Sequence, residues 1–495
     1  MKNTSFLPNI KDNFSDWYNE IISLAKLADY SPVKGCITIL PYGYAMWELM
    51  QKELDCGIKA MGAMNMAFPL LIPLHLLSKE KEHVAGFAPE IALVTVAGGE
   101  TLEEPLVIRP TSEVIIHSYF KKWIKSWRDL PIKVNQWCSV IRWEKRPRPF
   151  LRTTEFWWQE GHTAHETIEQ AKQQVEDAIQ LYKKFAEDFL CIPVILGKKP
   201  DHERFAGADE TWTIEGMMQD GKAVQMGTSH LLSEGFSTSI GIDFQDRGQK
   251  ISSPSLTSWG VTTRLIGTVI MVHGDQKGLV LPPLIAPIQI AIVPILKSSE
   301  NHDQINTKIA EIFRFLLKLN FRSKIYDDQS VSPGSRFAET ELQGIPFRIE
   351  IGERDLLRGE FTLYNRLNDR KEQIALNFLR DEEAVKDFFS SRIEHFQKKL
   401  FQDALFKRDK NIYRFAKFSD FLIESEKNKK NSFFLSRWCC KNEEIFKERG
   451  FTVRCLLSEK ASVESFMRGG ALEEICCIHD NCKENLKIAL IAKSY

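Results

Sequence analysis

The sequence lacks several features that define common protein classes. It has no phosphate-cradling glycine-rich loop with its lysine and no dinucleotide-binding glycine fingerprint, which disfavours the common parallel-sheet nucleotide folds. It has no net charge, because 66 Lys and Arg balance 66 Asp and Glu. Bulk electrostatics therefore gives no support for a nucleic-acid-binding protein, although a local basic face is still compatible with this balance.

Targeting signals and membrane segments are absent as well. The first twenty residues do not have the basic-then-apolar order of a secretion signal, and no apolar run is long enough to span a bilayer. Four cysteines are scattered, which fits a reducing compartment: Cys36, Cys56, Cys138 and Cys191. We expect a soluble, cytoplasmic protein with no membrane contact.

The 495 residues are enough for two to four domains, and their patterning predicts three. Residues 1–283 combine helices with β-rich segments that do not follow strict βαβ order, which favours an antiparallel sheet flanked by helices, an α+β fold. Residues 284–382 alternate strand, helix and strand, as in a small α/β domain. Residues 383–495 begin with a long helix and end in a small α/β unit, whose cysteines between Cys439 and Cys482 hint at a present or former metal site.

Apolar spacings of three and four predict two helices in the first domain. One covers residues 47–61 and ends at Gly62, and the other covers residues 166–190. The apolar run FPLLIPLHLL between them resembles a strand broken by Pro69 and Pro73.

The densest chemistry lies in residues 142–165, RWEKRPRPFLRTTEFWWQEGHTAH, with four arginines and three tryptophans. Alternation on both sides of a proline-stiffened loop predicts a strand–loop–strand hairpin. Arginine forks suit phosphate oxygens, and an exposed aromatic ring suits a purine face. A solvated hairpin with cross-strand ion pairs is the better explanation for any single arginine, but it does not explain the whole set. The hairpin would hold Arg142, Arg152, Phe156, Trp158 and His162.

The stretch RPTSEVII places Thr111 and Glu113 at alternate positions, on one face of a strand or at its end. A hydroxyl beside a carboxylate suits the nitrogen of an ammonium group. The same letters also resemble a helix N-cap, so a purely structural role is an open alternative.

Two later stretches carry further polar groups. AVQMGTSH presents Gln225, Thr228 and His230 close to a glycine, although a lone histidine is more often structural than functional. In TSWGVTTRLIG, Arg264 begins an apolar helix-like run. An arginine at the start of a buried helix needs a partner, and a phosphate would serve.

In chain order, these stretches resemble the three signature motifs of class II aminoacyl-tRNA synthetases. The helix and strand that end at Pro73 resemble motif 1, the Arg142 hairpin resembles motif 2, and GVTTRLIG resembles motif 3. The details are closer still to prolyl-tRNA synthetases of the archaeal and eukaryote-like type, and the resemblance covers essentially the whole chain. It rests on DYSPVKGCITILPYGYAMWE, EHVAGFAPEIALVT, EEPLVIRPTSE, DLPIKVNQW, ERFAGADETWTIE, TSWGVTTRLIG and the terminal Tyr495.

The resemblance implies an ATP- and Mg²⁺-dependent ligase that activates L-proline as prolyl-adenylate and transfers it to the 3′ end of tRNA(Pro). It implies a class II catalytic domain, an α/β anticodon-binding domain and a homodimer formed through the motif 1 helix and strand. Negative charge builds on phosphate oxygens when a carboxylate attacks the α-phosphorus, so two arginines and a metal are the expected stabilisers. The attacking carboxylate is already ionised and needs no general base.

The resemblance also implies residue roles. Arg142 would bridge the proline carboxylate and the α-phosphate, Phe156 would stack on adenine, and Arg264 would clamp the far end of the triphosphate; Arg142 and Arg264 would be catalytic. Proline would be held by Thr111, Glu113, Arg142, Trp158, His162, Phe205, His230 and Thr262. ATP would be held by Arg142, Glu144, Arg152, Thr153, Phe156, Gln225, Thr228 and Arg264.

Anticodon candidates come from the second domain. Alternation in IPFRIEIGERD places Arg348 and Glu350 on the face of a strand opposite its apolar residues, where a polar surface could read exposed bases. The polar outer face of a strand usually meets only water, so the structural alternative is strong. The candidates are Glu341, Arg348 and Asp355.

The sequence departs from the family pattern in three places. Thr154 replaces an arginine that is frequent in the family, and the motif 2 loop is one residue short, which we expect to weaken contacts with ATP or tRNA. Only about sixty residues separate His162 from Gln225, which leaves no room for a large editing domain. Adjacent cysteines do not suit one tetrahedral ion, so a structural zinc is not expected at Cys439, Cys440, Cys476, Cys477, His479 and Cys482.

Two other functions fit parts of the pattern. A non-catalytic paralogue would bind tRNA or a protein without making an adenylate, but the complete set of arginines argues against it. A threonine-specific synthetase would need a metal-ligating Cys/His set inside the catalytic domain, and the sequence places none there.

Overall fold

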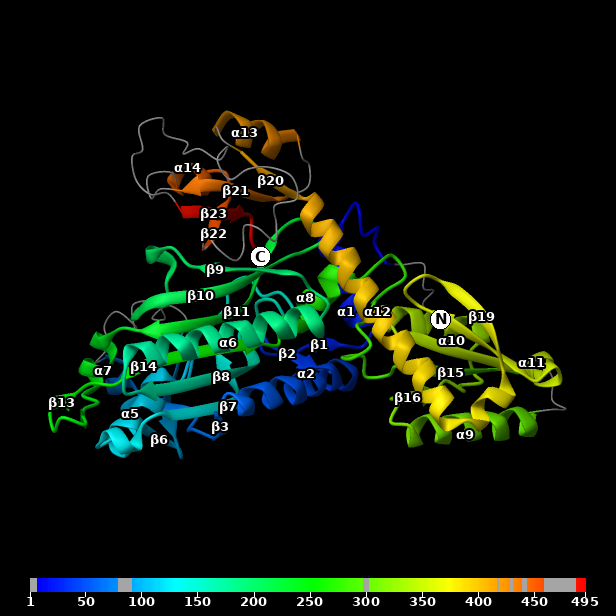
Figure 1. The fold of residues 1–495 in the computed structure, drawn as a ribbon, viewed down its shortest axis with the longest axis horizontal. Helices are drawn as coiled ribbons and strands as arrows, with labels where there is room; N and C mark the ends of the chain where they lie inside the picture. Colours follow the sequence, from blue (N-terminus) through cyan, green and yellow to red (C-terminus); the bar gives the residue numbers. More distant parts are fainter. Residues whose placement is uncertain are drawn as a thin grey trace.

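The computed structural model describes residues 7–78, 91–296, 302–415, 418–427, 431–438, 443–457 and 487–495. Within these residues, the largest element is an eleven-stranded sheet that crosses the left half of the molecule in Figure 1. Its strands, from one edge to the other, are β20 (Ile412–Arg414), β21 (Phe433–Trp438), β23 (Lys487–Ala492), β22 (Thr452–Leu457), β9 (Val194–Lys198), β10 (Ala208–Met217), β11 (Ala223–Leu232), β14 (Ser255–Thr262), β8 (Glu155–His165), β7 (Ile132–Ile141) and β3 (Met64–Asn65).

The central strands, from β9 to β7, pair antiparallel, and helices cover one face of this sheet. The helix α6 (Ile168–Asp188) packs across β11 and β14, and α2 (Pro41–Ala60) lies beside it. Apolar residues at spacings of three and four on both helices point into one core. The predicted antiparallel sheet flanked by helices is therefore confirmed, as are the two predicted helices.

The apolar run FPLLIPLHLL, predicted to form a strand, is only partly a strand in the structure. The run after Gly62 forms the short strand β4 (Leu71–Pro73) and then the helix α3 (Leu74–Ser78), so the prediction of a strand is wrong for its second half. Pro73 ends the strand because it lacks an N–H for further pairing. The strand β4 pairs with β6 (Glu100–Ile108), which also pairs with β5 (Ala92–Ala97).

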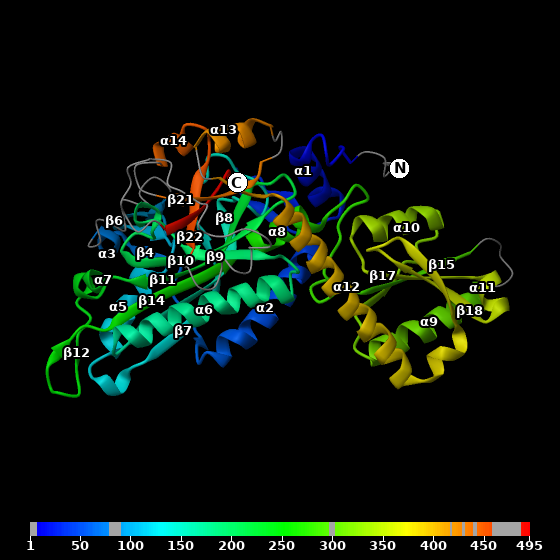
Figure 2. The same cartoon turned by 45° about the horizontal axis from the view of Figure 1, so that its top comes forward.

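A second sheet, of five strands, forms the predicted α/β unit at the right of Figure 2. The strand β15 (Ile290–Ile295) is parallel to β16 (Ser323–Ile325) and β17 (Phe347–Gly352), whereas β18 (Glu360–Asn365) and β19 (Arg370–Ala375) are antiparallel additions. Around it lie α9 (His302–Lys318), α10 (Pro333–Leu342) and α11 (Glu353–Arg358).

The long helix α12 (Glu382–Lys410) runs from this second sheet toward the first (Figure 2). Beyond it, β22 pairs with β9 through Leu456 and Lys198, so the C-terminal strands extend the large sheet. The helices α13 (Phe418–Lys427) and α14 (Glu443–Lys447) lie beside these strands. Because β22 of the third predicted unit pairs with β9 of the first, one sheet continues through both units. The predicted domain boundaries near residues 283 and 383 therefore stay predictions.

Smaller elements complete the described residues: α1 (Phe14–Leu24), β1 (Ala28–Tyr30), β2 (Ile37–Ile39), α5 (Glu113–Trp123), η3 (Trp127–Asp129), η4 (Asp201–Glu203), α7 (Glu234–Ile240), β12 (Phe244–Gln245), β13 (Ile251–Ser252), α8 (Arg264–His273) and η5 (Leu376–Arg380). The six residues considered for zinc, from Cys439 to Cys482, lie outside the described residues. Among the described helices, none has the length and apolarity needed to cross a membrane.

The two sheets are joined by a close backbone approach and a buried ion pair. Arg366 of the second unit is 2% exposed, and its two terminal nitrogens lie 2.6 and 2.8 Å from the carboxylate oxygens of Asp275. Beside it, Leu279 N donates to Leu342 O at 3.0 Å. Gly278, with φ of +141°, fits directly against Leu342, and a Cβ there would lie 2.5 Å from the Cα of Leu342.

We expect Gly278→Ala to separate the two units locally, because both its backbone conformation and the missing space forbid a side chain. The cost should be about 3 kcal/mol or more, since a strained φ alone costs on the order of 1–3 kcal/mol. The matched control is Gly359→Ala, where φ is +69° but no atom lies within 4 Å of the added Cβ. That change should cost only about 1 kcal/mol. Calorimetric melting of both variants measures the difference, and equal falls in Tm would contradict the expected clash.

Candidate active site

A cavity of about 450 Å³ opens on the face of the large sheet opposite α6. The alternation of β8 defines that face: Tyr182 of α6 donates to Gln159 at 2.5 Å, so the neighbouring Trp158 and Glu160 point to the other side. Every residue predicted to bind proline or ATP lines this cavity, namely Thr111, Glu113, Arg142, Glu144, Arg152, Thr153, Phe156, Trp158, His162, Phe205, Gln225, Thr228, His230, Thr262 and Arg264. Their roles there are still predictions.

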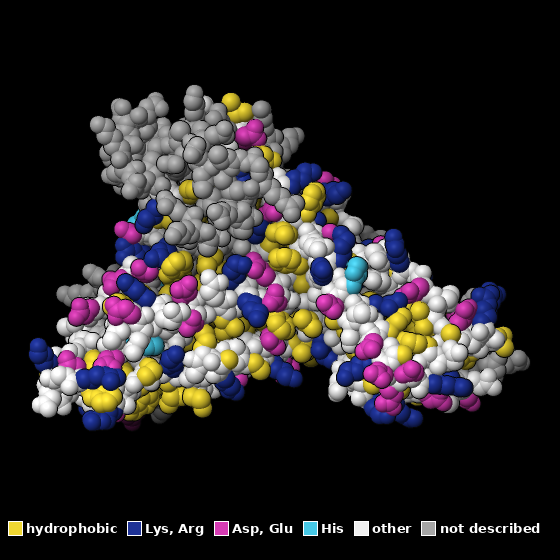
Figure 3. Space-filling view, viewed as in Figure 1, with side chains coloured by type: hydrophobic (Ala, Val, Ile, Leu, Met, Phe, Trp, Pro, Cys, Tyr) yellow, Lys and Arg dark blue, Asp and Glu magenta, His cyan; other side chains and the backbone are white. Residues whose placement is uncertain are grey.

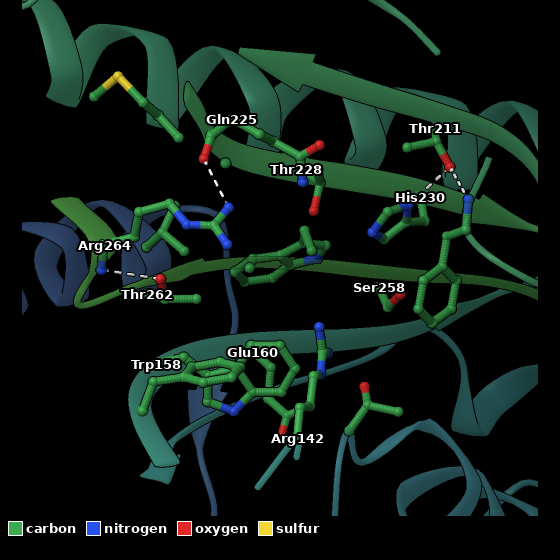
Figure 4. A pocket seen from close by; sticks show the side chains of 18 of the residues that line it. Arg142, Trp158, Glu160, Thr211, Gln225, Thr228, His230, Ser258, Thr262 and Arg264 are labelled. Atoms are coloured by element: carbon green, nitrogen blue, oxygen red, sulfur yellow. Dashed lines mark hydrogen bonds between the residues drawn. The ribbon is translucent and has the colours of Figure 1, made fainter. Parts of the chain in front are cut away.

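Arg142 follows directly after β7, where the predicted hairpin turns. Its Nε donates to Pro110 O at 2.9 Å, and its guanidinium lies 5.5 and 5.4 Å from the ring centroids of Phe156 and Trp158. The backbone and two rings therefore fix its direction, and Figure 4 shows it reaching into the cavity. A guanidinium held in this way is ready to bind an anion without further ordering.

Thr154 anchors the base of the same hairpin loop. It is 1% exposed; its N donates to Gly35 O at 2.8 Å, and its carbonyl accepts from Arg142 N at 2.9 Å. Gly35 has φ of +86°, and a Cβ on it would lie 2.2 Å from Thr154 Oγ1. Thr154 therefore leaves no room for a side chain at position 35. Whether Thr154 weakens contacts with ATP or tRNA stays a prediction.

Arg264 is the first residue of α8, as the sequence predicted. Its N donates to Thr262 Oγ1 at 3.0 Å, and its guanidinium donates to Leu151 O and Gln225 O, each at 3.1 Å. Burial, together with the charges of Arg152 and Arg142, lowers its pKa to about 10. It is still cationic at neutral pH, so this end of the cavity holds concentrated positive charge that suits a polyphosphate.

The other end of the cavity is acidic. Thr111 donates to the carboxylate of Glu113, and both side chains are almost fully buried. Glu113 is the first residue of α5, directly after Ser112 at the N-cap position. The capping alternative is therefore wrong for Thr111, and Ser112 makes no side-chain cap bond either, since its hydroxyl donates to Glu160. Hydroxyl and carboxylate together suit a cationic amine.

Sequence reasoning missed Glu160, the best-connected carboxylate of the cavity. It is 2% exposed and accepts from Ser112 N at 3.2 Å and from Gln136 Nε2 at 2.6 Å. The alternation in WWQEGH could have found it, because Glu160 stands between Trp158 and His162 on one face of β8. Thr211 and Ser258 also line the cavity and were missed, and their sequence context carries no comparable signal.

The two cavity histidines have opposite pKa shifts. Burial acts to lower the pKa of His162, but its 3.0 Å contact with Glu160 and the negative charges of Glu113 and Glu160 raise it above its usual value. Burial lowers the pKa of His230 to about 4. His230 is therefore a neutral ring at neutral pH; its Nδ1 lies 3.0 Å from Thr211 Oγ1, and Phe205 stacks on it with centroids 4.6 Å apart.

One other group has the composition of a metal site. Ligand atoms of His202, Glu203 and Glu443 lie within 4.8 Å of one another. The ammonium of Lys447 already lies 2.9 Å from Glu443, and that of Lys199 lies 3.5 Å from Glu203. Because these cations balance the carboxylates, we assign no metal to this group.

The solvent-facing strand predicted for the anticodon candidates is wrong. Every residue of β17 is buried, and Arg348 is 2% exposed. Its guanidinium lies 2.8 Å from Glu350 and 3.3 Å from Glu341, and it stacks on Phe337 and Tyr364. Alternation identified the correct face, but further side chains cover that face. Glu341 and Asp355 are partly exposed, and Asp355 accepts from Gly352 N at 2.8 Å.

Comparisons with known proteins agree with this geometry. Residues 95–273 match the tRNA synthetase class II core domain (G, H, P, S and T), and residues 289–384 match the anticodon binding domain. The chain is 46% identical to the proline–tRNA ligase of Borrelia garinii subsp. bavariensis over 99% of this chain and 100% of the relative. It is 44% identical to proline–tRNA ligase 2 of Bacillus cereus, over 95% of each chain.

Among solved structures, the chain is similar to prolyl-tRNA synthetase from Cryptosporidium parvum complexed with halofuginone and AMPPNP. The TM-score is 0.89 at 36% sequence identity, covering 99% of this chain and 100% of that chain. Sequence and structure comparisons thus extend over both sheets and the C-terminal strands.

The depressed pKa of His230 predicts a loss of stability in acid. The unfolded chain protonates this ring near pH 6.5 and the folded chain only near 4, so stability is complete above about pH 6.5 and falls as the pH drops toward 4. The full effect is at most about 3 kcal/mol. Because glutamine does not titrate, His230→Gln should lose less Tm than the parent between about pH 7.5 and pH 5. An equal loss in both proteins would contradict the neutral His230; His165 and His273, whose pKa values are also lowered to about 4, keep part of the loss in either case.

Proposed function

Because the chain belongs to the family of proline–tRNA ligases, which are class II aminoacyl-tRNA synthetases, we propose how its own residues perform the reaction of that family. The reaction activates L-proline with ATP as prolyl-adenylate and transfers the prolyl group to the 3′ end of tRNA(Pro). One observation carries the proposal: the carboxylate of Glu113 and the guanidinium groups of Arg142 and Arg264 line a single cavity.

The acidic end of the cavity binds the amino acid. The secondary ammonium of proline donates to Glu113 and Thr111, whose hydroxyl and carboxylate already contact each other. The proline carboxylate is then directed to Arg142, which lines the same cavity. Aromatic rings, two imidazoles and a hydroxyl enclose the ring of proline, from Trp158, His162, Phe205, His230 and Thr262.

The basic end binds ATP. Phe156 stacks on adenine, and Arg264 binds the far end of the triphosphate. Arg142 contacts both the attacking carboxylate and the α-phosphate, so it stabilises charge that develops only in the transition state. Five further residues complete the nucleotide site: Glu144, Arg152, Thr153, Gln225 and Thr228. Catalysis is then positioning plus electrostatics, with Arg142 and Arg264 as the catalytic residues.

Mg²⁺ fits the oxygen groups at this end. Glu144 lines the cavity as a partly buried carboxylate, and Gln225 adds an amide oxygen; both are hard ligands of the kind that Mg²⁺ prefers. When it arrives with ATP, the ion neutralises phosphate charge. The arginines still orient the α-phosphate, and Glu144 also accepts from Arg146 N at 2.8 Å, which orders the hairpin loop.

The second unit contacts tRNA(Pro). Glu341 and Asp355 are partly exposed beside β17 and are the better anticodon candidates. Arg348 acts mainly by holding Glu341, because its own guanidinium is buried among two carboxylates and two rings. We place the activity in the cytoplasm, where ATP and tRNA meet; this location rests on the reaction alone.

The first test is proline-dependent exchange of pyrophosphate into ATP. The parent protein should exchange with proline and far less with threonine, alanine or cysteine, because the pocket is shaped for a ring and a secondary ammonium. Arg142→Ala should lower exchange at least about 100-fold, the usual cost of removing one group that stabilises developing charge. The control is Arg314→Ala, an exposed arginine on α9 that should leave exchange unchanged. Exchange that survives in Arg142→Ala would refute the catalytic role of Arg142. Exchange with threonine alone would indicate a threonine-specific synthetase.

The family resemblance also implies a homodimer, and the surface supports this proposal. Six large apolar side chains are more than a third exposed on or beside β3, β4 and β5: Met64, Met66, Leu70, Leu71, Leu93 and Val96. Figure 3 shows hydrophobic side chains along the lower left edge of the molecule, where Figure 1 has β3 and β6. Exposed apolar groups that are this concentrated are typical of a surface that a partner covers.

We expect the parent chain to sediment as a dimer of twice 57.0 kDa and the double variant Leu93→Glu/Val96→Glu to sediment as a monomer. Two carboxylates in an apolar interface would be desolvated without partners, which costs several kcal/mol. Leu357→Glu is the control, because Leu357 is 82% exposed on α11, in the second unit. A dimer that persists in the double variant at the lowest measurable concentration would place the interface elsewhere.

A further inference from the structure

We propose that Arg454, in the C-terminal part of the chain, is a positioning residue for one wall of the proline pocket. The inference rests on the proposed function, because it concerns the same cavity. It deepens that function by giving the C-terminal strands a part in the binding of the amino acid.

The wall in question is formed by residues 199–205. Lys199, Glu203, Arg204 and Phe205 line the cavity, and Phe205 stacks on His230. The regular structure of this wall is the single turn η4, so the wall depends on side-chain contacts to hold it in place. At its two ends the backbone is tied to one residue: Lys199 N donates to Thr211 O at 2.8 Å, and Phe205 N donates to Thr211 Oγ1 at 2.9 Å.

Glu215 lies beneath the start of this wall and is fully buried on β10. Arg454 of β22 places Nε and Nη2 each 3.1 Å from one of its carboxylate oxygens, Oε2. The other oxygen, Oε1, lies 3.4 Å from Lys199 Nζ and accepts from Thr213 Oγ1 at 3.0 Å. Lys199 also lies 3.5 Å from Glu203, so it is shared between the buried carboxylate and the wall.

Arg454 determines how the ammonium of Lys199 is divided between Glu215 and Glu203. With Arg454 present, the charge of Glu215 is balanced by a two-nitrogen contact, and Lys199 is free to hold Glu203 as well. Without it, Lys199 would be the cation left within ion-pair distance of the buried Glu215 among the described residues. An uncompensated buried charge is costly, so Lys199 would be drawn toward Glu215 and away from Glu203. The wall would then lose its anchor on the side of the cavity.

A second link from the same C-terminal part reaches His202, in the middle of the wall. Glu443 of α14 contacts His202 Nε2 at 2.5 Å, and Glu443 is held from behind by Lys447 at 2.9 Å. Both links come from elements stacked on the edge of β9 in Figure 1. One registered pair, Leu456 with Lys198, joins β22 to β9, so side chains carry much of the connection at this point.

The test compares Arg454→Met, which keeps the length of the side chain without its charge, with Arg454→Lys, which keeps the charge without the fork. We expect Arg454→Met to raise the KM for proline about tenfold or more in pyrophosphate exchange, with the KM for ATP changed less than about twofold. Arg454→Lys should recover part of the loss. The control is Lys487→Met, an exposed cation on β23 in the same group of strands.

Two outcomes overturn the inference: an unchanged KM for proline in Arg454→Met, or equal changes in both KM values and kcat with a lower Tm, which would indicate a general structural role. If Arg454→Met does not fold, Arg454→Lys and Glu443→Gln carry the same comparison, and both should raise the KM for proline selectively. Absence of exchange in the parent protein would instead overturn the proposed function, so the two failures are distinguishable.

Discussion

Mutual repulsion among the arginines of one cavity is the constraint on which the site depends. Arg264 has its pKa lowered by burial and by Arg152 and Arg142, which means that the empty cavity holds cations at an electrostatic cost. Main-chain carbonyls hold them in place: Pro110 for Arg142, and Leu151 with Gln225 for Arg264. Neutral carbonyls orient a guanidinium without cancelling its charge, which suits the binding of a polyphosphate.

The cavity also holds negative charge. Glu113 and Glu160 are buried there, and the partners of their carboxylates include hydroxyls, an amide and a histidine. The cavity is therefore polarised from carboxylates to arginines, along the direction in which an amino acid carries its own charges. In the proposed function, a zwitterion that enters with its ammonium toward Glu113 brings its carboxylate toward the arginines, so the cavity would select the reactive orientation before any chemistry occurs.

Local patterns predicted the residues whose neighbours lie close in sequence. The hairpin of Arg142 and the helix that begins at Arg264 depend on alternation and apolar spacing, which the sequence displays. Glu160, Thr211 and Ser258 gain their place from the register of strands far apart in the chain, and no local pattern encodes that register. The solvent-facing position predicted for Arg348 is wrong for a related reason. Alternation tells which face of a strand a side chain takes, but not whether another element covers that face.

For the same reason, the sequence did not predict that the C-terminal strands join the large sheet. Glu215 and Arg454 are 239 residues apart, and each looks like an ordinary charged residue of a strand. Once β22 joins the edge of β9, each becomes the partner that makes burial of the other tolerable, since either alone would be an unbalanced charge in the interior. Docking of the C-terminal strands and ordering of the adjacent pocket wall are therefore one cooperative event. The large sheet thus brings Arg454, near the end of the chain, next to the site.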